Sequence, residues 1–341
     1  MKKYLISFLK LSISLGIGIG LIYWFVGKMS TDDKELTIDT FKRADYFWIL
    51  LAPILGMVSN FSRAQRWRQL LQPMGYYPGF WNTWFSIMLM YLFNLFFPRL
   101  GEVSRCGILA RYENVPLDKS IGTMVVERIV DLISILIIGV VLLFIEYDRL
   151  YSYFDANVLN KQAAPEAGAD FTKWIVLGVV VALLVGAAIY IEVKYGFAKL
   201  KTIMKDRLMG FAEGLKSIKN VKNPIEFIFH SIFIWICYFL MIYLSFFALP
   251  ETKSLGTFAG IACLFFGGFA MVATPGGIGA YPAVISQVLI LYAVQGTIGY
   301  AFGSIVWAAQ MGSILIGGLI SLILLAILNR EPALKEEPLK T

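Results

Sequence analysis

Three charged side chains lie inside an apolar segment of the sequence. Glu127, Arg128 and Asp131 fall within the run 121–146, and a helix would place them roughly 10–16 Å beyond Ser120. A charge at the centre of a lipid-exposed helix costs at least about 2.5–3.5 kcal/mol, so these side chains are predicted to face protein or water. Glu127 and Asp131 are four residues apart and share a helix face, and Arg128 is close enough to both for partial pairing.

A second charged group comes directly after an aromatic, uncharged run. The stretch "NLFFPRLGEVSR" adds two arginines and a glutamate close to a proline and a glycine. Guanidinium groups bind phosphate in a planar, bidentate way. The two groups together predict a site for an anionic headgroup, in which the carboxylates orient the arginines, take part in proton coupling or bind an amine. The predicted headgroup-binding residues are Asn94, Arg99, Glu102, Arg105, Glu127, Arg128 and Asp131. The alternative is a neutral salt-bridge network that only fastens these segments together.

The composition predicts that these residues belong to a membrane protein. Of the 341 residues 58% are hydrophobic, and the mean hydropathy is +0.70, whereas soluble domains average about 45–50% apolar. Six runs are long enough to cross a bilayer as helices: 4–26, 47–63, 121–146, 172–193, 226–249 and 299–327. We therefore expect one transmembrane domain over residues 1–329 and a cytoplasmic tail at 330–341.

Basic residues set the expected orientation. Lysines and arginines concentrate at the N-terminus and in segments 63–81 and 194–225, which the positive-inside rule assigns to the cytoplasm. The net charge of +7 then reflects loops that meet anionic lipids rather than nucleic acid. The three cysteines indicate no disulfide framework, and the single histidine, His230, has no ligand-spaced partner. We expect no metal, no cofactor and no catalytic motif.

The same charge count predicts a re-entrant hairpin. If residues 82–97 crossed the bilayer completely, the basic segment 194–225 would lie outside. Every loop falls on its favoured side if the chain instead turns at Pro98 and Gly101 and returns to the cytoplasm. Such a break is possible at membrane depth because non-helical backbone is tolerated where it is buried in protein or lines water.

A second broken region resembles the first. The apolar region 257–294 contains "TPGGIGAYP", with hinge residues at Pro275, Gly276, Gly277 and Gly279. Its glycines serve either as phosphate donors through freed amides or as close-packing positions. Corresponding breaks in two halves are typical of inverted repeats in transporters, here about 1–150 and 165–329. The predicted fold is an all-α polytopic membrane protein with six full transmembrane helices and two re-entrant broken hairpins.

Three elements together resemble a known family. They are "NLFFPRLGEVSR", "VVERIVD" and "ATPGGIGAYPAV", within a similarity that extends over about residues 60–290. They are similar to the flippase-like membrane family related to the transmembrane domain of bacterial lysylphosphatidylglycerol synthetase. The resemblance implies movement of a phospholipid, sometimes aminoacylated, between leaflets. The family often has a glutamate after the second glycine motif, where this chain has "AYPAV". Since the sequence ends at "NREPALKEEPLKT", we expect no aminoacyl-transferase activity from this chain.

The expected function is therefore a lipid flippase or a translocator of a lipid-linked precursor. The expected location is a bacterial-type plasma membrane, with both termini cytoplasmic and a membrane phospholipid or lipid-linked molecule as the partner. One alternative is a membrane enzyme that acts on lipid or polyprenyl phosphate with Glu102, Glu127 or Asp131 as base. Another is a scaffold for envelope assembly. The sequence leaves the oligomeric state open.

Overall fold

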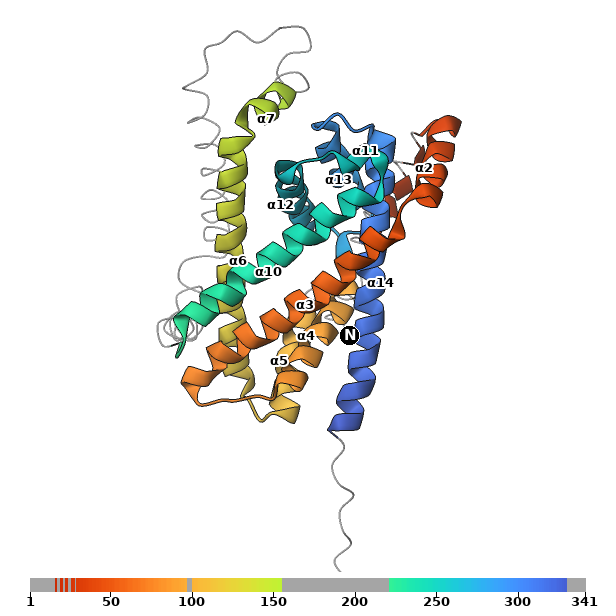
Figure 1. Ribbon diagram of the computed structural model, residues 1–341. Helices are drawn as coiled ribbons and strands as arrows, with labels where there is room; N and C mark the ends of the chain where they lie inside the picture. Colours follow the sequence, from red (N-terminus) through yellow and green to blue (C-terminus); the bar gives the residue numbers. More distant parts are fainter. Residues whose placement is uncertain are drawn as a thin grey trace, which may run out of the picture.

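The described part of the chain is helical and contains no strand. The computed structural model describes residues 29–96, 100–154 and 221–329 and individual residues between 16 and 27. The helices are α2 (Thr31–Arg43), α3 (Tyr46–Leu71), η1 (Gln72–Met74), α4 (Phe80–Phe96), α5 (Leu100–Tyr112), α6 (Leu117–Ile145), α7 (Tyr147–Phe154), α10 (Pro224–Ser245), η3 (Phe246–Ala248), α11 (Pro250–Lys253), α12 (Thr257–Ala273), η4 (Pro275–Gly277), α13 (Ala280–Ile290) and α14 (Gly296–Leu328) (Figure 1).

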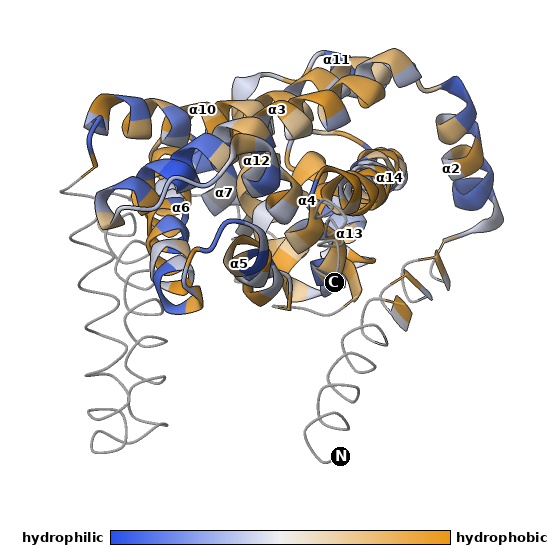
Figure 2. Cartoon of the chain, turned by 90° about the horizontal axis from the view of Figure 1, so that it is seen from below, coloured by the Kyte–Doolittle hydropathy of each residue, from blue (hydrophilic) through white to orange (hydrophobic). Residues whose placement is uncertain are grey.

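Four helical segments among the described residues are long and apolar enough to cross a membrane. They are Tyr46–Met74, Leu117–Ile145, Pro224–Ala248 and Gly296–Leu328, and they correspond to four of the six predicted spans. The other two, at 4–26 and 172–193, lie wholly or mostly outside the described residues. The protein is thus an all-α membrane protein. In Figure 2, α14, seen nearly end-on, has hydrophobic colours, in contrast to the largely hydrophilic α2.

Helices α4 and α5 form the first predicted hairpin, and both of its outer ends lie on the same face of the molecule. Gly79, directly before α4, donates its backbone N–H to Glu113 Oε2, directly after α5, over 2.8 Å. Asn82 Nδ2 donates to Oδ1 of Asn329, at the end of α14, over 2.9 Å. We call this side the first face. Both ends of the α4–α5 hairpin therefore lie on one face, which is the arrangement that a re-entrant hairpin requires.

The close contact between α4 and α5 requires a glycine at position 101. A Cβ atom there would collide with the Met90 carbonyl oxygen and would lie 2.7 Å from Cγ of Asn94. The Gly101 N–H donates to Asn94 Oδ1 over 2.9 Å, so Asn94 caps the beginning of α5. The turn itself, with Pro98 and Arg99, lies outside the described residues.

Helices α12 and α13 form the second hairpin, joined by η4. Gly276, Gly277 and Gly279 have φ of 61°, 73° and 70°, a left-handed region that glycine adopts without a steric penalty. A Cβ atom on Gly276 would lie 2.9 Å from Cδ2 of Leu95, near the tip of the first hairpin. The turn of the second hairpin therefore lies against the end of α4, close to where the described part of the first hairpin stops.

The opposite face of the molecule, which we call the second face, carries the outer ends of the second hairpin. Asp45 donates its backbone N–H to the Ala248 carbonyl over 2.9 Å. Arg43 Nη1 lies 2.6 Å from Oε1 of Glu251, a residue of α11, which directly precedes α12. The two hairpins thus enter the protein from opposite faces.

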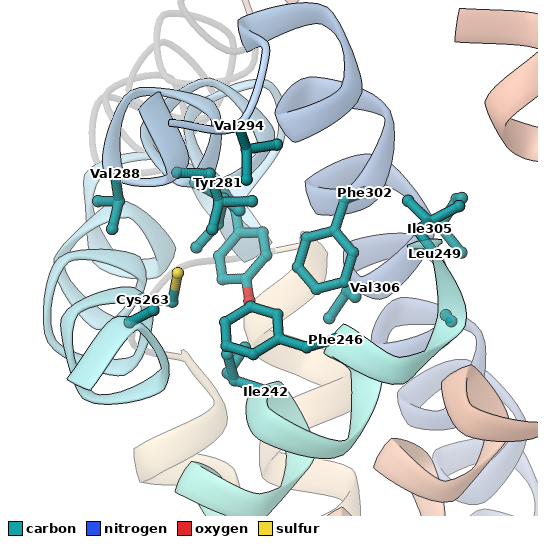
Figure 3. Close-up of a cluster of buried hydrophobic side chains, with 14 of the residues drawn as sticks. Ile242, Phe246, Leu249, Cys263, Tyr281, Val288, Val294, Phe302, Ile305 and Val306 are labelled. Atoms are coloured by element: carbon teal, nitrogen blue, oxygen red, sulfur yellow. The ribbon is translucent and has the colours of Figure 1, made fainter. Parts of the chain in front are cut away.

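Two apolar clusters fix the hairpins to the spans. Around the second hairpin, side chains from α10, α12, α13 and α14 face one another (Figure 3), and the rings of Phe246 and Phe302 lie 5.5 Å apart. Around the first hairpin, the buried side chains include Trp67 of α3, Phe85 of α4 and Leu109 of α5. This cluster around the first hairpin holds α5 against α3, next to the charged residues.

Candidate functional site

Glu127 of α6 is fully buried and has three arginine partners. Its Oε1 accepts from Arg63 Nη1 and lies 3.3 Å from Arg66 Nη2, and its Oε2 lies 2.9 Å from Arg105 Nη2. The side chains of Arg66 and Arg105 are 0% exposed. Because these arginines come from α3 and α5, one carboxylate joins three helices.

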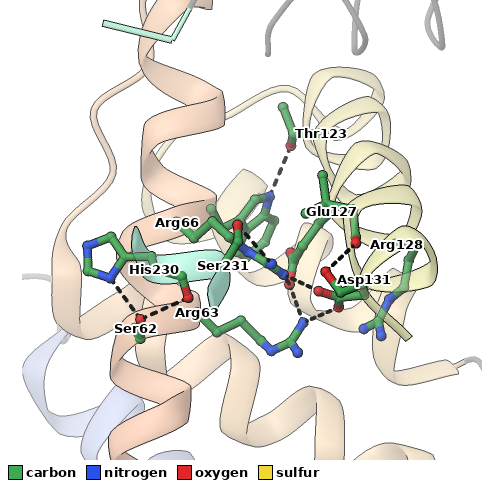
Figure 4. A network of polar contacts seen from close by, with 12 residues as sticks. Ser62, Arg63, Arg66, Thr123, Glu127, Arg128, Asp131, His230 and Ser231 are labelled. Carbon is green, nitrogen blue, oxygen red and sulfur yellow. Dashed lines mark hydrogen bonds and ion pairs between the residues drawn. The ribbon is translucent and has the colours of Figure 1, made fainter. Parts of the chain in front are cut away.

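Asp131, one helical turn after Glu127, shares two of these partners. Its Oδ2 accepts from Arg63 Nη1 over 2.9 Å and its Oδ1 from Arg66 Nη2 over 2.7 Å. Figure 4 shows the carboxylates of α6 directed at the guanidinium groups of α3. We call Arg63, Arg66, Arg105, Glu127 and Asp131 the buried charge cluster.

Helical spacing and one aromatic ring position the cluster. Arg63 and Arg66 are three residues apart on α3, so they share a face. The Arg105 guanidinium lies 4.4 Å from the ring centroid of Trp67, a distance at which the ring face attracts a cation. The Trp67 indole N–H in turn donates to Thr123 Oγ1 of α6 over 3.0 Å. The ring is thereby fixed between the two helices that carry most of the charges.

Helix α10, from the second half of the chain, completes the polar network. Arg63 Nη2 donates to the Tyr238 hydroxyl over 3.1 Å. That hydroxyl lies 3.4 Å from the hydroxyl of Tyr91 on α4. Arg66 Nη1 donates to Ser231 Oγ over 3.5 Å. The cluster therefore contacts elements of both predicted repeats.

Arg128 takes a partner different from the one that the sequence predicts. The described ion pairs place its Nη2 3.9 Å from Glu102 Oε1, and its side chain is 42% exposed. The described ion pairs include none between Arg128 and Glu127 or Asp131, because Arg128 projects from α6 about 100° away from Glu127, toward α4 and α5. Its Nη2 also lies 3.5 Å from Met90 Sδ.

The other predicted headgroup residues are only partly brought together. Arg105, Glu127 and Asp131 meet in the buried charge cluster. Asn94 binds the backbone of α5, and Arg99 lies outside the described residues. The role of each in headgroup binding stays a prediction.

Sequence reasoning missed Arg63 and Arg66. It ended the second span at residue 63 and treated the arginines that follow as loop charges. The helix instead continues to Leu71. The available signal was the run "RAQRWRQLL", in which Trp67 follows Arg63, and Leu70 follows Arg66, by four residues, so that apolar side chains share the helix face of the two arginines.

Comparison with known proteins identifies the family. The family model described as "Lysylphosphatidylglycerol synthase TM region" matches residues 9–318. The chain belongs to this family. The resemblance found in the sequence motifs is thereby confirmed, and a multi-pass membrane protein follows from the family and the apolar helices together.

Part of the chain also matches a curated membrane protein. The chain is 28% identical over 87 residues to "UPF0104 membrane protein MJ1595" of Methanocaldococcus jannaschii, which is 25% of this chain and 26% of the relative. The match therefore spans about a quarter of the relative's length. No solved structure shows a significant match.

Proposed function

We propose that this protein moves a phospholipid with an anionic or aminoacylated headgroup, or a lipid-linked precursor, between the leaflets of its membrane. The description of the family refers to the transmembrane region of a lysylphosphatidylglycerol synthase, which points to lipid as the substrate class. The observation that carries the proposal is the charge balance of the buried charge cluster.

The cluster has one positive charge in excess when all its members are ionised. Three guanidinium groups face two carboxylates. Among the described residues, Arg105 Nε and Nη1 have no hydrogen-bond partner, although a buried donor without a partner is costly. A phosphate oxygen would supply both the missing charge and an acceptor.

The exposure of the polar groups is graded, which supports access from an aqueous or headgroup region. The side chains of Arg128 and Glu102 are 42% and 24% exposed, Asp131 is 15% exposed, and Glu127 is 0% exposed. A headgroup would first meet the Arg128 and Glu102 pair and then the buried charge cluster. The described network reaches from the first predicted repeat to the second through Tyr238, so movement of one predicted repeat against the other would change the cluster.

A reconstitution experiment tests the proposal. Purified protein is inserted into vesicles that carry a tail-labelled fluorescent phosphatidylglycerol, and an impermeant reductant is added outside. We expect the reductant to bleach label from both leaflets, whereas in protein-free vesicles only the outer leaflet is bleached. Tail-labelled phosphatidylcholine and a lysine-esterified phosphatidylglycerol in parallel vesicles report headgroup selectivity. Equal bleaching in folded-protein and protein-free vesicles for all three lipids would reject lipid translocation.

A matched pair of variants tests the role of the cluster. Each charge-assisted contact to a phosphate contributes about 1.5–3 kcal/mol, so Arg105→Met is expected to reduce movement of phosphatidylglycerol about 10- to 150-fold. Arg43→Met is the control, because Arg43 forms an ion pair with Glu251 on the second face and its side chain is 31% exposed. Equal transport by both variants would place the headgroup site elsewhere.

A further inference from the structure

A groove between α3 and α10 lies to one side of the buried charge cluster. Its volume is about 280 Å³, close to the lower limit for ligand pockets in proteins. Phe229 and Phe233 of α10 stack at 5.6 Å on one wall, and Phe61 and Phe80 stack at 5.7 Å on the other. Apolar walls of this kind suit an acyl chain.

The lining of the groove includes a serine and the only histidine in the chain. Ser62 Oγ lies 2.7 Å from His230 Nδ1, and a second acceptor, the His230 carbonyl, is 3.4 Å from the same hydroxyl. His230 Nε2 lies 3.6 Å from Glu226 Oε1. Figure 4 shows the Ser62 hydroxyl aimed at the imidazole ring. If Nδ1 accepts the hydroxyl proton, the ring proton is on Nε2 and faces the carboxylate.

The sequence of contacts from hydroxyl to imidazole to carboxylate is that of an activated nucleophile. A hydroxyl becomes reactive when an adjacent base is oriented by a third group, and the arrangement is recognised by geometry rather than by sequence position. Here α3 supplies the hydroxyl, and α10 supplies the base and the carboxylate that orients it.

Gln65 offers a hydrogen-bond donor in the same groove. It follows Ser62 by three residues on α3 and also lines the groove, so both side chains share a helix face. Its Oε1 accepts from Arg68 Nη1 over 2.6 Å. The amide nitrogen is therefore the Gln65 side-chain atom left to donate a hydrogen bond. No described residue accepts a hydrogen bond from that nitrogen. A side-chain amide is one of the donors that stabilise the oxyanion of acyl transfer.

The depth of the site matches the ester groups of a bilayer. Helix α10 begins at Pro224 on the first face, where Lys222 Nζ lies 3.2 Å from the Tyr77 hydroxyl. His230 comes six residues later, roughly 9 Å along the helix. The headgroup layer on each side of the hydrocarbon core is about 5–7 Å thick. With Pro224 placed at the aqueous edge of that layer, the serine and the histidine would lie close to the boundary where acyl ester groups are found.

We propose that this groove is an acyl-transfer site for an ester-linked membrane lipid. The Ser62 oxygen attacks the ester carbonyl carbon while its proton passes to His230 Nδ1, and the Gln65 amide stabilises the oxyanion. The bond from the carbonyl carbon to the lipid's alcohol oxygen then breaks, and that oxygen takes the proton from His230. Water releases the acyl group from Ser62 as a fatty acid, again with His230 as base. Glu226 is a positioning residue that holds the imidazole in the required tautomer.

Covalent labelling tests the nucleophile directly. The full-length protein in vesicles is treated with a fluorescent alkyl fluorophosphonate, and the modified peptide is identified by mass spectrometry. We expect modification of Ser62 in the wild type, no modification of that peptide in Ser62→Ala, and a decrease of about 10²-fold or more in His230→Gln, the range expected for loss of a general base. Ser104→Ala is the control, because the Ser104 hydroxyl of the wild type donates to the Gly101 carbonyl. This variant should label as the wild type does.

Substrate turnover gives a second readout. Vesicles of phosphatidylglycerol with radiolabelled acyl chains are incubated with each protein, and free fatty acid is measured. Release by the wild type and by Ser104→Ala, but not by Ser62→Ala or His230→Gln, supports the proposal. Size-exclusion chromatography and thermal unfolding establish that each variant is folded. A folded wild type that neither labels at Ser62 nor releases fatty acid overturns the proposal, as does labelling that is unchanged in His230→Gln.

Discussion

Arg105 of α5 forms an ion pair with Glu127 of α6 over 2.9 Å, and neither side chain is exposed. This contact fastens the first hairpin to the long span α6. Glu127 also has Arg63 and Arg66 as partners, so the two sides of the pair are not equivalent. Loss of the arginine leaves the carboxylate with two cations, whereas loss of the carboxylate leaves Arg105 without a carboxylate partner among the described residues.

The first prediction follows from this asymmetry. Glu127→Gln raises the excess charge of the buried charge cluster to two positive charges, and we expect a loss of about 3–5 kcal/mol of unfolding free energy, as for a broken buried pair. Arg105→Met leaves two cations and two anions and is expected to cost less. The combined variant should be more stable than the sum of the single losses predicts. Thermal unfolding in detergent measures all three, and strict additivity would contradict the coupling.

The second prediction concerns the two hairpin glycines. Gly101→Ala is expected to abolish folded yield, because the new methyl group meets the Met90 backbone oxygen, which cannot move aside. Gly276→Ala is expected to lower stability by about 1 kcal/mol or more, because φ is 61° and alanine is strained there. Gly268→Ala is the control, since its nearest contact is a side-chain atom at 3.4 Å. Equal yields of folded protein for all three variants, measured by size-exclusion chromatography, would contradict the close contact at α5.

The third prediction is a pH dependence on the second face. Hydrogen bonds from Thr297 and Ser30 hold the pKa of Asp33 below its ordinary value. A carboxylate with a lowered folded pKa stabilises the protein above the unfolded pKa, and this contribution is lost as the pH falls through the folded pKa. Wild type should therefore exceed Asp33→Asn in unfolding temperature at pH 7, and the difference should shrink below about pH 4. Asp32→Asn is the neighbouring control, and a constant difference across this range would contradict the assignment.

The fourth prediction is the orientation of the two faces. Single cysteines replace Glu113 on the first face and Glu251 on the second in a cysteine-free background. We expect an impermeant maleimide to label position 251 from outside the cell and position 113 only after the membrane is opened, because the positive-inside rule assigns the first face to the cytoplasm. External labelling of position 113 would reverse this orientation.

Much of the fold could be predicted because hydropathy, charge and helix breakers act locally. The spans around Glu127 and His230 are long apolar runs, and Pro275 and Gly276 interrupt a helix wherever they occur. The first hairpin was predicted from the parity of the basic loops, and the second from its similarity to the first. The exact number of spans and the boundaries of the two repeats stay predictions.

The site was less predictable because its geometry depends on packing between distant segments. Hydropathy alone gives no indication that α6 covers Arg63 and Arg66, since arginines at the end of a span are usually interfacial. The pairing of Arg128 with Glu102 depends on where α5 lies, which the local spacing on α6 does not specify. Arg105 was found because it follows a helix break that already required a wet or buried environment.

The indole of Trp307 on α14 donates its N–H to the Gly276 carbonyl over 2.7 Å, at the tip of the second hairpin. Indole emission shifts to longer wavelength when the ring passes from an apolar to an aqueous setting. A protein in which the other seven tryptophans are replaced by phenylalanine would thus carry an intrinsic optical reporter of the hairpin tip. Its emission, followed during addition of lipid vesicles, would show without any attached dye whether the surroundings of the tip change.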